Sequence, residues 1–344
     1  RTSTNPAEAL QGKIAGVNIM KAGGNAGAGV QVKIRGVKTF GDNQPLYIID
    51  GFPGDIENVN PQDIQSMEVL KDGAAAAIYG SVAANGVNIV TTKNGKKGDK
   101  KIDFSTYVSF TSVAKKLELQ NAEVTMPAFV NKNTGIDTDW QDAMLRGGVS
   151  QNYMFSIRGG SENAQYSLSY NHADEKGIFL GNNYRQDNAR LKLHMSKYIF
   201  DIDAIIAFKF TDSKQPEYSI KEMYMISPLV PIYDDTREYV FGLSDFDDLP
   251  SNRNVMADQH YEKSTDKKYH TTANVALTMN FTPWLNFKTS YAYRGEHQRQ
   301  TYHTPAYVAD PKAKRDYPYH SETTGYWEEH VWENVLSFNK TFGN

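Results

Sequence analysis

The 344-residue chain contains no cysteine, which excludes disulfides, thiolate metal sites and thiol nucleophiles together. No run of 18 apolar residues occurs in it, so a membrane-spanning helix is not predicted. The net charge of −3 provides no basic excess, and we expect no nucleic-acid partner. The chain begins at Arg1 and lacks a secretory signal pattern, so we expect it to be a fragment of a longer protein.

Residues 45–95 combine strand and turn signals in close succession. An apolar run at residues 46–49 ends at the turn signal Asp50-Gly51, and Asn60 followed by Pro61 has the pattern of a helix start. The predicted elements that follow are a strand at 67–70, an alanine-rich helix at 74–78 and a strand at 87–92. This succession predicts a small, compact α/β unit.

The residues before this unit predict two further strands, at 17–20 and 30–35, after a short helix that ends near residue 17. The glycine-rich stretch 21–29 joins them and lacks the GK[ST] ending of a phosphate-binding loop. If strands 30–35 and 46–49 run in opposite directions, loops 21–29 and 51–59 lie together at one end of the unit. The turn 37–44 then lies at the other end.

From residue 101 onward, apolar and polar residues alternate with a period of two. The clearest segment has Ile202, Ile206 and Phe208 on one face and Asp203 and Lys209 on the other. Strands with one apolar and one polar face are typical of a membrane barrel with a wet interior. Eight such segments are predicted, at 102–111, 153–159, 164–173, 187–196, 200–211, 269–281, 285–294 and 327–342.

The connections between these segments alternate in length. Short turns occur at 159–163, 196–198 and 282–284, and long loops at 113–151, 174–186, 212–267 and 296–326. Outer-membrane barrels sort their loops in this way, with short turns on the periplasmic side and long loops outside. A soluble β-sandwich remains the alternative. Eight strands alone would enclose no room for the N-terminal unit, whereas a barrel of about 22 strands would.

Several short motifs in fixed order resemble the plug signature of the SusC/RagA-type TonB-dependent outer-membrane transporters of Bacteroidota. They cover residues 9–96 and read LQGKIAGVNI, IRG, PLYIIDG and QSMEVLKDGAAAAIYGSVAANGVNIVTTKNG. The resemblance implies an α/β plug domain at residues 1–98, truncated at its N-terminus and without its TonB box. Residues 99–344 would then supply about eight strands of an antiparallel transmembrane β-barrel.

The resemblance also implies a function. Such transporters import oligosaccharides, or sometimes peptides, across the bacterial outer membrane, in which they are multi-pass proteins surrounded by lipid. A SusD-like surface lipoprotein serves as the lid, and the TonB–ExbB–ExbD complex supplies energy. We expect no enzymatic activity and no cofactor. Iron-siderophore import, a non-transporting glycan-binding or adhesion protein, and an outer-membrane glycan hydrolase remain alternatives.

The apical plug loops are the first candidate site, because in plugged transporters they face the extracellular vestibule. The candidate substrate-binding residues there are Asn25, Phe52, Asp55, Glu57 and Asn58. Arg35 and Asp50 are instead predicted to hold the plug to itself and to the wall by charge-assisted bonds.

The loop at 212–267 is the second candidate site. Residues 214–266 contain five Lys/Arg and eleven Asp/Glu, interleaved with tyrosines. Tyrosine faces and carboxylates suit stacking on and hydrogen bonding to sugars, and packing of the loop on a partner protein fits equally well. The candidate residues for substrate or lid contact are Tyr218, Tyr224, Tyr233, Tyr239, Asp245 and Asp247.

No motif predicts catalysis or a metal site. The acidic run 245–248 lacks the spacing of a calcium loop, and the histidines lack zinc-site spacing. Ser81 is not in a nucleophile elbow. Tyr198, Trp284 and Trp327 are predicted at strand ends, where the aromatic girdle of a membrane barrel lies.

Overall fold

The computed structural model describes residues 17–21, 25–28, 30–34, 45–70, 85–98, 100–125, 135–233, 241, 254–308 and 314–341. Several predictions fall outside these residues. They are the helix before residue 17, Arg35, the turn 37–44, the helix 74–78, Ser81, Tyr239 and the acidic run 245–248 with Asp245 and Asp247.

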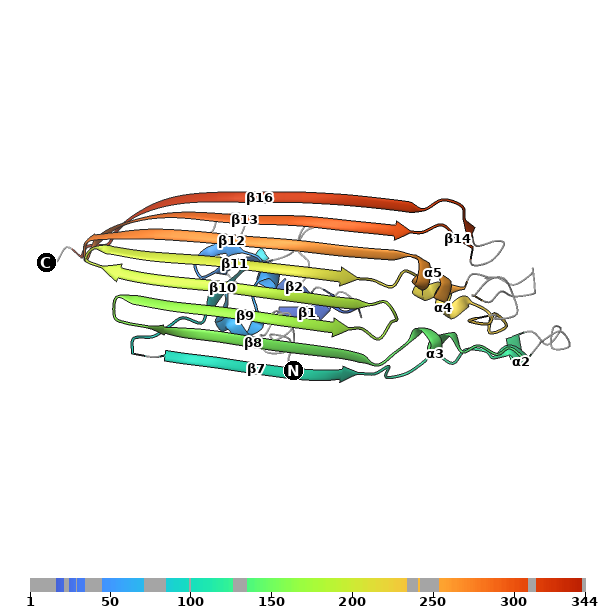
Figure 1. Ribbon diagram of the computed structural model, residues 1–344. Coiled ribbons are helices and arrows are strands. Elements are labelled where there is room, and N and C mark those ends of the chain that lie inside the picture. The colour runs from blue at the N-terminus through green and yellow to red at the C-terminus, as the bar shows by residue number, and fades with distance from the viewer. Residues whose placement is uncertain are drawn as a thin grey trace.

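Eight long antiparallel strands form one sheet in which every strand pairs with its neighbours in sequence (Figure 1). We call this sheet the wall, and its eight strands confirm the prediction. The strands are β7 (Lys100–Thr111), β8 (Gly148–Gly160), β9 (Ala164–Lys176), β10 (Asn183–Lys197), β11 (Phe200–Lys214), β12 (Lys263–Thr282), β13 (Leu285–Thr304) and β16 (Tyr319–Phe338).

Most wall strands extend beyond their predicted ends, whereas β16 ends at Phe338, before the predicted end at residue 342. Asn183 pairs with Lys176, so the connection predicted at 174–186 contracts to residues 177–182. Polar side chains interrupt the apolar pattern there, but the backbone ladder continues because its hydrogen bonds do not depend on side-chain polarity. The connection after β13 carries a two-residue pairing of β14 (Tyr307–Val308) with β15 (Lys314–Arg315).

The wall is an arc with different convex and concave faces. On β11, Ile206 and Phe208 lie 43% and 55% exposed on the convex face, whereas Ile205 and Lys209 are buried on the concave face. On the convex face Tyr269, His297 and Tyr326 are register partners, and Lys267 and Arg299 follow toward the long-loop end. The convex face therefore changes from apolar to aromatic to charged in that direction.

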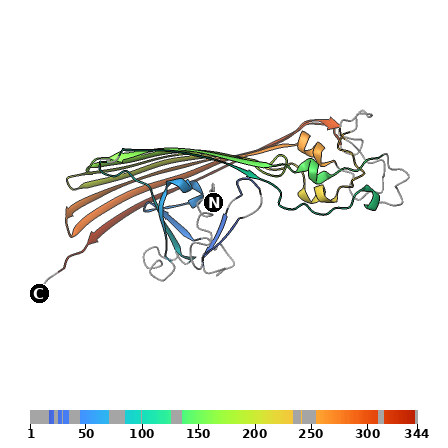
Figure 2. The ribbon, with the colours of Figure 1, turned by 90° about the horizontal axis from the view of Figure 1, so that it is seen from below.

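The plug, meaning the described residues between 17 and 98, lies against the concave face (Figure 2). Its main sheet has the order β4-β3-β6-β5, in which β3 and β6 are parallel. A separate hairpin pairs β1 with β2. The strands are β1 (Val17–Lys21), β2 (Val30–Ile34), β3 (Leu46–Ile49), β4 (Phe52–Gly54), β5 (Ile64–Leu70) and β6 (Val87–Thr92).

The centre of the plug is apolar, and Val87 and Val90 are fully buried there. Two short 3-10 turns, η2 (Ile56–Asn58) and η3 (Pro61–Asp63), connect β4 to β5. The helix start predicted at Asn60 is therefore a single turn. The Asn60 side chain accepts a hydrogen bond from the Gln62 N–H, as a capping residue does, but β5 begins directly after this turn, at Ile64.

A helical cap lies at the long-loop end of the wall, as Figure 1 shows. It contains α2 (Ala122–Thr125), α3 (Trp140–Met144), α4 (Ile220–Met225) and α5 (Val255–Tyr261). Trp140, Met144, Met223, Val230 and Val255 form its buried core, so loops from different hairpins pack as one body. No helix in the described part of the chain has the length and apolar character needed to cross a membrane.

Candidate functional site

Asp50 forms the principal anchor of the plug to the wall. Its side chain is 3% exposed and accepts bonds from Arg190 Nη2 at 2.7 Å and Lys192 Nζ at 2.8 Å, both on β10. The backbone N–H and hydroxyl of Thr92 also donate to it, at 2.9 and 2.6 Å. The prediction that Asp50 holds the plug to the wall is confirmed.

Opposing effects act on the pKa of Asp50. Burial raises the pKa, but the charges of Lys192 and Arg190, together with the hydrogen bonds from Lys192 and Thr92, outweigh it and hold the pKa below the ordinary value. The carboxylate is therefore ionised at neutral pH. An ionised carboxylate with this many donors forms strong, charge-assisted bonds.

A second anchor holds the apical loop itself. Lys209 of β11 is only 9% exposed and donates from Nζ to the backbone carbonyl of Glu57 at 2.5 Å. Nearby, Ser169 donates to Asp63 Oδ2 at 2.8 Å, yet burial raises the pKa of Asp63 above its usual value. The two plug carboxylates thus differ, because Asp50 has cationic partners in direct contact and Asp63 has a neutral one.

Residues 25–28 contact the wall at a different position along the strands. The Ala26 N–H donates to Asn182 Oδ1 at 2.7 Å and the Gly27 N–H to Glu175 Oε2 at 3.2 Å. Gly27 has a φ of +67°, and a Cβ there would lie 2.2 Å from the Tyr184 ring, so only glycine fits. This contact lies nearer the long-loop end than the contact of Glu57 with Lys209.

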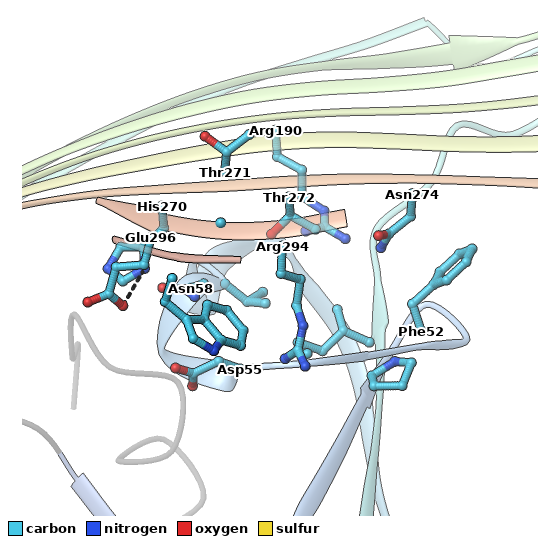
Figure 3. A pocket seen from close by; sticks show the side chains of 16 residues that line it. Phe52, Asp55, Asn58, Arg190, His270, Thr271, Thr272, Asn274, Arg294 and Glu296 are labelled. Atoms are coloured by element: carbon cyan, nitrogen blue, oxygen red, sulfur yellow. Dashed lines mark ion pairs between the residues drawn. The ribbon is translucent and has the colours of Figure 1, made fainter. Parts of the chain in front are cut away.

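A cavity of about 160 Å³ lies between the apical loop and the wall (Figure 3). Phe52, Asp55 and Asn58 line it from the plug, and the wall contributes side chains of β10, β12, β13 and β16. Figure 3 shows Arg294 pointing from the wall toward the plug loop. The wall residues are Arg190, His270, Thr271, Thr272, Asn274, Arg294, Gly295, Glu296 and Trp327.

Several of these side chains are already paired. His270 Nδ1 lies 3.2 Å from Glu296 Oε2, and Arg294 pairs with Glu329 and lies 5.6 Å from the centre of the Trp327 ring. Within the described part of the chain, Asn274 Oδ1 and Arg190 Nε are buried and have no hydrogen-bond partner. A polar ligand or water in this cavity can satisfy such groups.

The structure thus brings Phe52, Asp55 and Asn58 together, whereas Asn25 lies by the separate contact at residues 25–28. Sequence reasoning missed Asn274, Arg294 and Trp327. The girdle prediction is wrong for Trp327, because β16 begins at Tyr319 and Trp327, the register partner of Glu296, faces the cavity. The sequence alone could not have indicated this, because both faces of residues 326–335 mix charged and apolar side chains, and only the pairing of Glu329 with Arg294 shows which face meets the plug.

The tyrosines of the second candidate site have different surroundings. Tyr218 is buried in the cap, its hydroxyl donates to the Met144 carbonyl at 3.3 Å, and burial raises its pKa to about 12. Tyr224 lines a groove of about 820 Å³ on the cap. Tyr233 is 55% exposed, and its ring lies 5.6 Å from that of Phe241. Tyr224 and Tyr233 are thus the more accessible of the three.

Metal-binding chemistry finds no support within the described ranges, where no three His, Asp or Glu side chains cluster closely enough to hold an ion. What the seam between plug and wall does offer is hydrogen bonding, charge and aromatic surface.

Known proteins with a similar sequence or structure identify the class to which this architecture belongs. The TonB-dependent Receptor Plug Domain family matches residues 1–87. The chain is 34% identical over 264 residues to the TonB-dependent receptor SusC of Bacteroides thetaiotaomicron, which covers 70% of the chain and 26% of that protein. It is 30% identical over 362 residues to a TonB-dependent receptor of Formosa agariphila, covering 98% of the chain and 34% of the relative.

A solved structure of the RagAB peptide importer in its "closed-closed" state superposes with a TM-score of 0.83 at 18% identity. The superposition covers 100% of the chain described here and 44% of the matched chain of the RagAB structure. A plug beneath an eight-stranded arc is therefore the architecture of part of a TonB-dependent receptor. Within that class, the chain belongs to the SusC/RagA-type family, as the sequence motifs predicted. It spans about a quarter to a third of the length of the curated relatives that it matches.

Proposed function

We propose that the protein imports an oligosaccharide across the bacterial outer membrane, driven by TonB. The observation that carries this proposal is the polar character of the contact between plug and wall. The plug is held to the wall largely by ion pairs and hydrogen bonds, at Asp50, Glu57, Asp63 and Ala26. In a wet lumen these groups exchange protein partners for water, so the plug can be displaced at modest cost.

An oligosaccharide suits the chemistry of the cavity. Asp55, Asn58 and Asn274 offer planar hydrogen-bonding groups beside the Trp327 ring. Such groups bind hydroxyls, and an aromatic ring packs on the apolar face of a sugar. Peptide import is the second candidate, because a peptide carboxylate can compete with Asp50 for Arg190 or with Glu329 for Arg294, and because RagAB is a peptide importer.

The same proposal includes location and partners. The apolar convex face, bounded by the row of Tyr269, His297 and Tyr326, fits a multi-pass position in the outer membrane with lipid around it. A SusD-like lipoprotein would close over the cap, and Tyr224 and Tyr233 are available to contact it or the cargo. The TonB–ExbB–ExbD complex would pull the plug after cargo has bound. The proposed role is transport without catalysis.

The test uses the complete protein with its lid in cells that have or lack TonB. Uptake of a labelled oligosaccharide should require TonB and should fall in Trp327→Ala and Asn274→Ala. Trp332→Ala is the matched control, because Trp332 lies on the convex face and is 73% exposed. Uptake of peptides alone would favour the second candidate, and growth that depends on iron would favour siderophore import.

Two further outcomes separate the remaining alternatives. Glycan binding without TonB-dependent accumulation would indicate an adhesion protein. Cleavage of the oligosaccharide by the purified protein would contradict the absence of catalysis.

A further inference from the structure

Two polar cavities follow one another along the seam, and Phe52 lines both. The cavity described above lies toward the long-loop end and has a volume of about 160 Å³. The second, of about 300 Å³, lies toward the short-turn end and is lined by charged groups that include Asp50, Lys192, Asp203 and Lys288. Each exceeds the roughly 30 Å³ that one water molecule occupies, and each has the polar lining that water needs.

The wall residues of the two cavities occupy different levels of the same strands. On β12 the first cavity is lined by residues 270–274 and the second by Ala276. On β13 the corresponding residues are 294–296 and Lys288. The cavities are therefore stacked along the strand direction, and the Phe52 side chain lies between them.

The surroundings of Phe52 are apolar, in contrast to both cavities. Its side chain is 5% exposed and packs with Ile205, Ala276 and Ala292, which are also buried, and with Val331. These four residues come from β11, β12, β13 and β16, so they span half of the wall strands. A narrow passage lined only by apolar groups excludes water and ions, because nothing replaces their hydration.

We propose that Phe52 is a hydrophobic gate that seals the seam between the plug and strands β11, β12, β13 and β16 against passive flow of water and ions. The role concerns permeability at rest and holds whatever the cargo is.

The position of the two anchors supports a gate that stays closed until the plug moves. Asp50 is bound to Arg190 and Lys192 two residues before Phe52, and the Glu57 carbonyl is bound to Lys209 five residues after it. The Lys288 ammonium lies 5.9 Å from the centre of the Phe52 ring on the side of the second cavity. The backbone on both sides of Phe52 is therefore tied to the wall, and displacement of the plug at either anchor would withdraw the ring from its apolar seat.

The experiment measures ion conductance of the complete protein in planar bilayers without TonB. Phe52→Ala should raise the resting conductance several-fold, and Phe52→Leu, which keeps an apolar side chain, should leave it near the wild-type level. Phe208→Ala is the matched control, since Phe208 lies on the opposite face of β11 and is 55% exposed.

A second variant addresses the wall side of the gate. The double substitution Ala276→Ser and Ala292→Ser makes the seat of the ring wettable with little change in volume, and it should also raise the conductance. It tests the gate even if Phe52→Ala does not fold. Wild-type conductance in a folded Phe52→Ala or in the double variant would overturn the proposal. An equal rise in Phe208→Ala would overturn it as well.

Because conductance is measured without cargo, lid or TonB, this result is independent of the import assay. A leaking Phe52→Ala variant with no oligosaccharide uptake by wild type would support the gate and reject the proposed cargo.

Discussion

Asp50 combines a local and a long-range role in one side chain. Its φ of +51° lies in the left-handed region, which aspartate tolerates better than most residues and which the turn after β3 requires. The same carboxylate bonds to Thr92 within the plug and to Arg190 and Lys192 on the wall. The turn therefore places the anchor, and the anchor ties the plug to the wall.

The first prediction concerns this carboxylate. Asp50→Asn leaves the buried Arg190 and Lys192 without their counter-charge, so we expect the plug to lose about 3 kcal/mol of attachment. Hydrogen exchange of β3 and β6 in the complete protein should then become faster. Asp63→Asn is the control, because Asp63 is a buried carboxyl whose hydrogen bond from Ser169 an amide oxygen can also accept. An equal effect in both variants would contradict the assignment of Asp50 as the anchor.

At the scale of elements, the cap converts separate loops into one unit. Short helices such as α3 and α4 are not stable alone, and their order depends on the buried core that they share. Asp139 and Ser219 cap these helices through bonds to the N–H groups of Asp142 and Glu222. Any movement of the long-loop end should therefore carry α3 and α4 together.

The second prediction tests this unit with two methionines of α4. Met223 is fully buried and Met225 is 53% exposed. Met223→Ala should destabilise the cap by about 2–5 kcal/mol because it leaves a cavity in the core. Hydrogen exchange should then accelerate in both α3 and α4 but not in β10. Met225→Ala should change neither helix, and a response confined to α4 would show that the loops behave separately.

At the scale of the whole molecule, plug and wall meet through titratable groups, so their attachment depends on pH. The folded pKa of Asp50 is lowered, so its contribution is full above the ordinary aspartate value of about 3.9 and is lost as pH falls through the lowered pKa. The raised pKa of Asp63 acts in the opposite sense, since its burial favours the protonated form.

The third prediction follows from these two signs. Attachment of the plug, measured as the denaturant midpoint of plug unfolding in the complete protein, should be nearly constant at neutral pH and should fall below about pH 4. Asp50→Asn should abolish most of that acid-dependent decline. Persistence of the full decline in this variant would assign it to other carboxylates.

Prediction from sequence succeeded where a pattern is local. Period-two alternation identified eight wall strands because each side chain of a strand must face either the convex or the concave side. Prediction failed at the ends of the wall strands, where the backbone ladder continues past the apolar pattern. It also failed after Asn60, where a single 3-10 turn is present in place of the predicted helix. Phe52, Asp55 and Asn58 line one cavity because they share one loop, and their role in binding substrate stays a prediction.

The amino-acid sequence alone determined the family, the plug strands other than β4, which lies within the predicted loop 51–59, and the two faces of the wall, since these depend on neighbours along the chain. Only the tertiary structure decided which wall residues meet the plug. Arg190 is 140 residues from Asp50, and Val331 is still farther from Phe52. Their contacts depend on strand register and on how the plug sits in the arc, and no local pattern carries that information.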